Sequence, residues 1–191
     1  MLKKFITILL LTTSLFAMQK EDIKENMSKN IYNVLEILKN KSLSKEQKGK
    51  EIIKIMDTSF DYQIMSMLAL GSNWKSISNE QKSNFSKAFE IRLKDSYIDK
   101  LELYTNQKMQ INELEEIKNR LVLKTLLVGE KENFPIDYKF YKNNKNNQWF
   151  IYDVNILGVS IIQTYRTQFE QYLKDKSIES LIEYLKTKNE V

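Results

Sequence analysis

WFIYDVNILGVSIIQTYRTQFEQYL, residues 149–173, passes from a strand-like pattern through a single glycine into a helix-like pattern. Asp153 and Arg166 are the only charged residues among its first 21 positions, 149–169. The segment predicts the last strand of a sheet followed by a helix, with Gly158 allowing a sharp turn where a side chain would obstruct packing or a ligand. Such an apolar block either fills a core or lines a cavity, and periodicity alone does not separate the two.

Three further strand patterns precede this segment, at residues 108–116, 120–129 and 136–142. The last of them alternates apolar and polar residues cleanly, and short polar turns separate the strands. Consecutive strands with short connections pair antiparallel, because parallel pairs need a long crossover. We therefore expect a four-stranded antiparallel sheet.

Helical patterns lie on both sides of the strands in the sequence. Apolar residues recur every three or four positions in residues 19–40, 44–57, 61–70, 79–104, 160–174 and 177–188. Ser44 and Ser78 are each followed three residues later by glutamine, which predicts a capping box at two helix starts. Helices before and after a run of strands predict the α+β class, with helices packed against one face of a curved sheet.

The first residues have the features of a secretory signal peptide. MLKK is a short cationic start, residues 5–16 are mostly apolar, and Ala17 offers a small residue for cleavage. The apolar run is shorter than the roughly 20 residues that a membrane-spanning helix needs. We therefore expect removal of residues 1–17 and a single domain, residues 18–191, in the periplasm.

Composition narrows the chemistry that the chain can perform. It has no histidine and no cysteine, so the usual general base, the usual zinc ligands and disulfides are missing. No Gly-rich phosphate loop or nucleophile elbow occurs, and we expect no cofactor and no metal. The net charge of +5 comes from scattered lysines and not from a concentrated patch, which argues against a nucleic-acid partner.

Four stretches occur in a characteristic order: LALGSNWKSISNEQKSNFSKAFEIRL at 68–93, YIDKLELY at 97–104, FPIDYKFYK at 134–142 and WFIYDVNILGVSIIQTYRTQF at 149–169. Together they resemble the MlaC family of periplasmic phospholipid-binding proteins, also called toluene-tolerance proteins. The resemblance spans nearly all of the chain after the predicted signal peptide. Its most specific part is the pattern W-x-x-Y-D-V, G-V-S, Y-R-x-Q-F in the last stretch.

The resemblance implies a fold of the nuclear-transport-factor-2-like (NTF2-like) class, with an apolar cavity between sheet and helices for phospholipid acyl chains. It also implies a shuttle that is not an enzyme. Such a shuttle carries lipid between an outer-membrane lipoprotein–porin complex and an inner-membrane ABC transporter, whose substrate-facing component has an MCE domain. The chain departs from the family pattern in its Lys-rich and Asn-rich composition and in residues 108–119, which bears on partner surfaces more than on fold.

The candidate lipid-binding residues are apolar side chains expected on the inner surfaces of the sheet and helices. They are Met65, Leu68, Phe89, Leu93, Tyr97, Leu101, Leu123, Leu127, Tyr138, Phe140, Val154, Val159, Ile162 and Tyr165. Each could equally belong to the core, because periodicity separates inside from outside but not core from cavity.

Arg166 is one of only three arginines among the 30 basic residues. Its planar fork of donors suits a lipid phosphate or a carboxylate, and we favour a structural ion pair with an acid such as Asp153 or Asp137. Two rival functions stay open. An enzyme of the same broad fold would need Asp137 or Asp153 isolated in the cavity, and a periplasmic interaction module would have a filled core without lipid.

Overall fold

The computed structural model describes residues 18–98 and 107–187 of the chain. The predicted signal peptide, residues 1–17, lies outside the described residues, as do positions 99–104 of the predicted long helix. Among the described residues, no helix is both long and apolar enough to cross a membrane.

The helices and strands follow the predicted order. The first helices are α1 (Ile23–Lys39), α2 (Lys45–Met56), α3 (Tyr62–Leu70) and α4 (Asn79–Ile98), with short 3-10 helices η1 (Asp57–Ser59) and η2 (Gly71–Lys75) flanking α3. The strands are β1 (Lys108–Ile117), β2 (Arg120–Val128), β3 (Asn133–Asn143), β4 (Gln148–Ile156) and β5 (Val159–Ser160), and the last helices are α5 (Ile161–Tyr172) and α6 (Ile178–Lys186).

Local hydrogen bonds explain two of the helix starts. The hydroxyl oxygens of Ser44 and Ser78 accept the backbone N–H of Gln47 and Gln81, and each glutamine side chain accepts the N–H of its serine. Both predicted capping boxes are therefore confirmed, and each satisfies donors that a helix start leaves unpaired.

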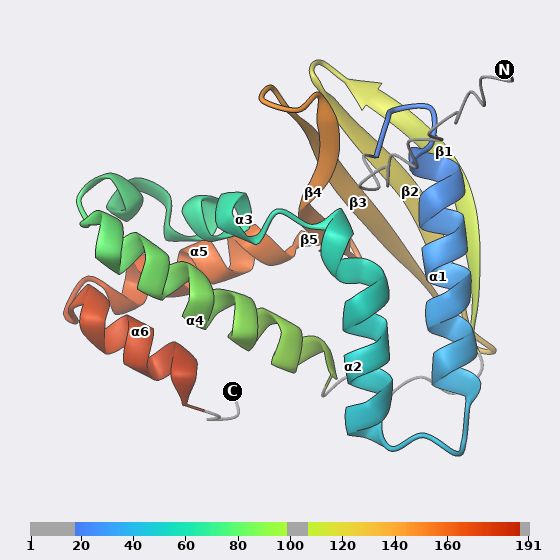
Figure 1. Ribbon diagram of the computed structural model, residues 1–191, viewed down its shortest axis with the longest axis horizontal. Helices are drawn as coiled ribbons and strands as arrows, with labels where there is room; N and C mark the ends of the chain where they lie inside the picture. Colours follow the sequence, from blue (N-terminus) through green and yellow to red (C-terminus); the bar gives the residue numbers. More distant parts are fainter. Residues whose placement is uncertain (1–17, 99–106, 188–191) are drawn as a thin grey trace, which may run out of the picture.

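The strands form one antiparallel sheet in sequence order, β1-β2-β3-β4-β5. The predicted meander and the α+β class are confirmed. The two-residue strand β5 is an addition, because residues 159 and 160 pair with the end of β4 before α5 begins. Figure 1 shows the curved sheet with α1 along one face and the helices α3 to α6 grouped beyond β4.

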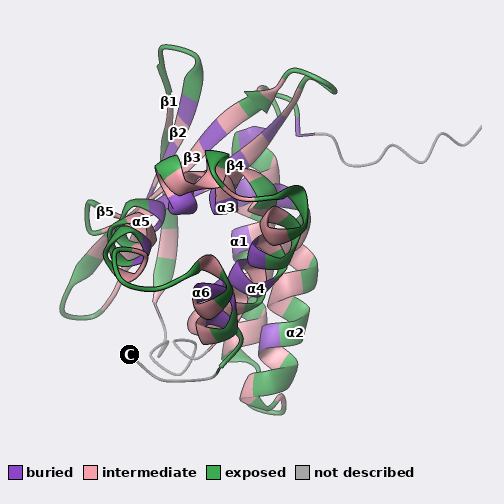
Figure 2. Cartoon of the chain, turned by 90° about the vertical axis from the view of Figure 1, so that its left-hand side faces the viewer, coloured by how far each residue is buried: buried purple, intermediate pink, exposed green. Residues whose placement is uncertain are grey.

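The buried side chains form two clusters; Figure 2 colours the buried residues of the chain purple. The sheet cluster joins α1 to the sheet and contains Ile23, Met27, Ile31, Leu121, Leu123, Phe140 and Ile151. The helix cluster joins α3, α4, α5 and α6 and contains Met65, Ala69, Leu70, Phe85, Phe89, Phe169 and Leu181. Phe60 and Ile161 pack against both clusters, so they connect the two halves of the core.

The turn between β4 and β5 has two consecutive residues with positive φ, Leu157 at 54° and Gly158 at 80°. The expectation that a side chain at Gly158 would obstruct its surroundings is wrong, since a Cβ built there meets nothing within 4 Å. Backbone conformation is the reason for glycine, because L-residues adopt positive φ at a cost of about 1–2 kcal/mol.

We expect Gly158→Ala to lower the free energy of unfolding by about 1 kcal/mol, although space is open around the new methyl group. Leu157→Asn, at the other positive-φ position, is expected to raise stability slightly, because asparagine tolerates this conformation better than leucine. Urea unfolding of both variants measures the effect. A Gly158→Ala variant as stable as the parent chain would contradict the assignment.

Candidate functional site

α1 packs against one face of the sheet, which is fully covered toward the start of β2. Side chains of cross-strand partners project from the same face of a sheet. Leu121 pairs with Phe140, which pairs with Ile151, and none of the three has any accessible surface. This end of the face is therefore packed core.

Toward the other end of the strands the same face opens. Leu114 and Tyr138 pair with Leu123, and Ile111 and Ile136 pair with Thr125. The partly exposed apolar residues of this region form a continuous surface that we call the apolar strip: Met109, Ile111, Leu114, Leu127, Phe134, Ile136, Tyr138 and Ile156. Apolar surface left partly exposed beside a closed core is where an apolar ligand gains most from burial.

The apolar strip carries no charge. Thr125, within it, donates its hydroxyl to the carbonyl oxygen of Ile136 at 2.7 Å, so its polar group is satisfied internally. Burial raises the pKa of Tyr138 to about 12, which keeps its phenol neutral at ordinary pH. The surface therefore offers contact area without an electrostatic preference.

The structure divides the predicted lipid-binding residues. Leu127 and Tyr138 belong to the apolar strip, while Leu68 and Tyr165 are partly exposed at the edge of the helix cluster. Buried in one of the two clusters are Met65, Phe89, Leu93, Leu123, Phe140, Val154 and Ile162. Leu101 and the side chain of Tyr97 lie outside the described residues.

Three of the buried predictions, Phe89, Leu123 and Phe140, have no accessible surface at all. A side chain that lines a cavity large enough for a methylene chain presents some surface to it, and in this structure these three are packed within the core clusters instead. Val159 on β5 pairs with Ile156 of the strip and is 60% exposed, so it lies at the edge of the strip.

Met109, Ile111 and Leu114 in β1 were not among the residues predicted from sequence to line this surface. The register between β1 and β2 shifts between Ile111 and Leu114. Ile111 and Leu114 therefore share a face, although they are three positions apart in the sequence. Simple alternation would place them on opposite faces. The bulge is why residues 108–116 show only a weak strand pattern.

Asp153 and Arg166 take separate structural partners. The Asp153 carboxylate, 5% exposed as a residue, accepts from Lys139 Nζ at 2.9 Å, from Ser160 Oγ at 2.7 Å and from the N–H of Ile162 at 3.1 Å. It therefore ties β3 and β4 to the start of α5, where the Ser160 hydroxyl also caps the helix by accepting the N–H of Gln163.

Arg166 donates from Nε to Glu170 Oε1 at 2.9 Å, one helical turn away and near the surface. The partners named from sequence, Asp153 and Asp137, are thus wrong for Arg166. The guanidinium lies over the end of α3, since a Cβ built on Gly71 would come within 2.9 Å of Arg166 Nε. Glycine at position 71, with φ +60°, keeps this approach open.

The described residues contain no group of three or more acidic side chains that could hold a metal ion. Asp137 pairs with Lys124 and Asn155 across the sheet, on the face opposite the apolar strip. Asp153 projects from that same opposite face, as the partner of Lys139. Neither acid considered for catalysis is therefore isolated among the residues of the strip.

Comparisons with known proteins match both the sequence and the fold. The family model described as "MlaC protein" matches residues 28–187. A curated relative from Haemophilus influenzae, named "Intermembrane phospholipid transport system binding protein MlaC", is 32% identical over 117 residues, which cover 59% of this chain and 55% of the relative. The chain thus spans about half the length of this curated relative.

A solved structure of a phospholipid-binding protein from Ralstonia solanacearum, in complex with a phospholipid, has a similar fold. Its TM-score with this chain is 0.71 at 21% sequence identity, over 85% of this chain and 93% of that chain. At this identity the likeness concerns the arrangement of helices and strands.

Proposed function

The chain belongs to the MlaC family, and on that premise we propose that it is a phospholipid-binding carrier whose acyl-chain contacts include the apolar strip. The observation that carries the proposal is the change in burial along one sheet face. At one end Leu121, Phe140 and Ile151 are sealed, and at the other a continuous set of apolar side chains stays partly exposed. A filled-core interaction module would not need this second region.

The energetics of the strip suit a carrier better than a receptor of high specificity. Burying one methylene group contributes about 0.8 kcal/mol relative to water, but a phospholipid begins in a bilayer where its chains are already dry. Loading is therefore an exchange between two apolar environments. An uncharged apolar surface makes this exchange close to balanced, so that partner proteins can decide when lipid enters or leaves.

The setting of this carrier follows from the same proposal. An exported protein of this kind would work in the periplasm, after loss of residues 1–17, between an outer-membrane lipoprotein–porin complex and the MCE-domain component of an inner-membrane ABC transporter. It would need no cofactor. An enzymatic role is less well supported, because Asp153 is engaged by Lys139, Ser160 and Ile162.

We expect Ile136→Asn, in the middle of the apolar strip, to lower bound phospholipid per folded protein about tenfold. The amide would lose hydrogen bonds to water when a lipid chain covers it, at a cost of about 1–3 kcal/mol. Mass spectrometry of organic extracts from the purified protein measures the lipid, and circular dichroism confirms folding.

The matched control is Ile117→Asn, which makes the same change at a 51% exposed position at the end of β1. This variant is expected to retain its lipid. Equal lipid content in the Ile136→Asn variant and the parent chain would remove the strip from the binding site. Extracts of the parent chain without phospholipid would contradict the proposed function itself.

A further inference from the structure

A basic groove lies at the end of the sheet opposite the apolar strip. It has a volume of about 960 Å³ and lies where β1 and β3 end and β2 and β4 begin, beside α3 and η2. Along β2, β3 and β4, the fully covered residues Leu121, Phe140 and Ile151 separate the groove from the strip. The groove is therefore a second surface, distinct from the proposed lipid site.

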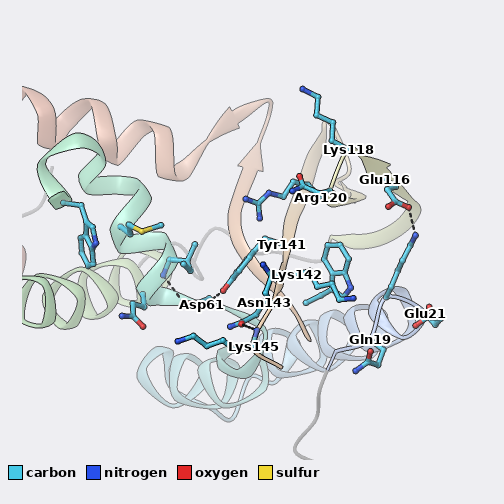
Figure 3. A pocket seen from close by; sticks show the side chains of 18 residues that line it. Gln19, Glu21, Asp61, Glu116, Lys118, Arg120, Tyr141, Lys142, Asn143 and Lys145 are labelled. Atoms are coloured by element: carbon cyan, nitrogen blue, oxygen red, sulfur yellow. Dashed lines mark hydrogen bonds and ion pairs between the residues drawn. The ribbon is translucent and has the colours of Figure 1, made fainter. Parts of the chain in front are cut away.

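Cations in the groove outnumber the acids that could neutralise them. Five basic and three acidic side chains line it. Lys20 pairs with Glu116, and Asp61 accepts from the N–H of Ile64 and from the Tyr141 hydroxyl. Among the described residues, Lys118, Arg120, Lys142 and Lys145 have no carboxylate within ion-pair distance, and Figure 3 shows these four around the opening. The groove therefore has an unbalanced positive charge.

Arg120 is held in place by aromatic rings instead of acids. Its guanidinium carbon lies 4.9 Å from the ring centre of Tyr152 and 5.5 Å from that of Tyr141. Tyr141 is fixed in turn by its hydrogen bond to Asp61 at the start of α3. Cation–π stacking orients the guanidinium but leaves its N–H donors free for an incoming carboxylate.

The opposite wall of the groove is apolar. Ile64 and Met67 of α3 and Trp74 of η2 line it, whereas the largely buried Trp149 lies at the start of β4, opposite Lys142 of β3. We propose that this groove docks an acidic, partly apolar segment of a partner protein, whose carboxylates meet Arg120 and the lysines and whose apolar side chains meet Trp74 and Met67. Charge complementarity of this kind speeds encounter and selects among partners.

A protein segment fits the groove better than a lipid headgroup does. Leu121, Phe140 and Ile151 leave no accessible surface through which a lipid in the apolar strip could reach the cations. Leu127, at the far end of the strip, lies seven positions along β2 from Arg120, roughly 23 Å of extended strand, whereas Leu114 lies two positions from Glu116 of the groove. A headgroup bound near Leu127 therefore lies beyond the reach of Arg120, which projects from the opposite face of the sheet as the partner of Tyr141.

Intrinsic fluorescence gives a direct test, because the only two tryptophans of the chain, Trp74 and Trp149, both line the groove. A short synthetic peptide of Asp, Glu, Leu and Ser, without aromatic residues, is titrated into the full protein. We expect a saturable change in tryptophan emission that weakens as salt is added. Arg120→Gln combined with Lys142→Gln is expected to reduce the affinity for the peptide at least about tenfold. The double variant removes two charged groups that are expected to bind the carboxylates of the peptide.

Two further variants keep the test decisive. Lys118→Gln with Lys145→Gln leaves the Arg120 stack intact and is expected to weaken binding as well. Lys87→Gln with Lys176→Gln removes the same charge from exposed positions on α4 and before α6, and is expected to bind like the parent chain. Lipid content is expected to stay unchanged in all three, which separates this proposal from the proposed function.

Several outcomes would overturn the proposal. One is the absence of a saturable fluorescence response when the peptide is added to the parent chain. Another is an equal loss of peptide affinity in the Lys87→Gln, Lys176→Gln control, because the effect would then depend only on net charge. Binding of phosphatidylglycerol vesicles through Arg120 and Lys142, without peptide binding, would assign the groove to a lipid surface and not to a protein segment.

Discussion

Replacing Phe89 with alanine is expected to lower the free energy of unfolding by about 4 kcal/mol and to leave lipid per folded protein unchanged. The Phe89 ring has no accessible surface and lies 5.9 Å from Phe85, 5.8 Å from Phe169 and 5.1 Å from Tyr165, measured between ring centres. Its removal leaves a cavity and breaks edge-to-face contacts among α4 and α5, which adds to the cost of the lost burial. Urea unfolding followed by circular dichroism measures the loss.

The matched comparison for this variant is Phe134→Ala, at a partly exposed position of the apolar strip. The same change there is expected to cost less stability, about 1–2 kcal/mol, and to reduce bound lipid. The opposite pattern, with lipid lost from a stable Phe89→Ala variant, would show that Phe89 lines the cavity. The pair of variants thus separates core from lining where periodicity cannot.

The order and type of the helices and strands could be predicted from sequence because their signals are local. The capping boxes at Ser44 and Ser78 mark helix starts within four residues, and the alternation in residues 136–142 marks β3. The short turns between strands restrict the topology to a meander. Each of these signals depends on neighbours a few positions away.

The candidate site was less predictable because it depends on contacts between distant segments. Phe140 and Tyr138 are two positions apart and share one face of β3. Only Tyr138 retains exposed surface, because Phe140 lies within the buried part of the sheet cluster. No local pattern distinguishes the two residues. In β1, the bulge between Ile111 and Leu114 further hid the strip, because the strand does not alternate there.

The expectation that the lysines are merely scattered is corrected by the groove. Lys118, Arg120 and Lys142 fall in or beside separate strands and never form a basic run in the sequence. Antiparallel pairing places Arg120 opposite Tyr141 and so brings the ends of β2 and β3 together. A charge cluster made by strand ends is invisible until the register is known.

We expect Asp153→Ala to lower the free energy of unfolding by about 3 kcal/mol. The loss leaves the Lys139 ammonium, a Ser160 hydroxyl donor and the Ile162 N–H without their acceptor. The Lys139 side chain is 25% exposed and can recover some hydration when its partner is removed. The expected loss of stability is therefore near the lower end of the range for a broken buried ion pair. The stability of Asp153→Asn is expected to lie between those of the parent chain and Asp153→Ala, since its amide oxygen can still accept one of these hydrogen bonds.

Glu170→Gln is the control for Asp153→Ala, because it breaks the ion pair with Arg166 where both side chains are more than two-fifths exposed. That variant is expected to lose no more than about 0.5 kcal/mol, as is usual for a surface pair within one helix. Equal unfolding midpoints for Asp153→Ala and Glu170→Gln in urea would contradict the assignment. The predicted difference has a structural cause: Asp153 joins β3, β4 and the cap of α5 beside Ile161, which connects the two core clusters, whereas Glu170 holds only a neighbour on its own helix.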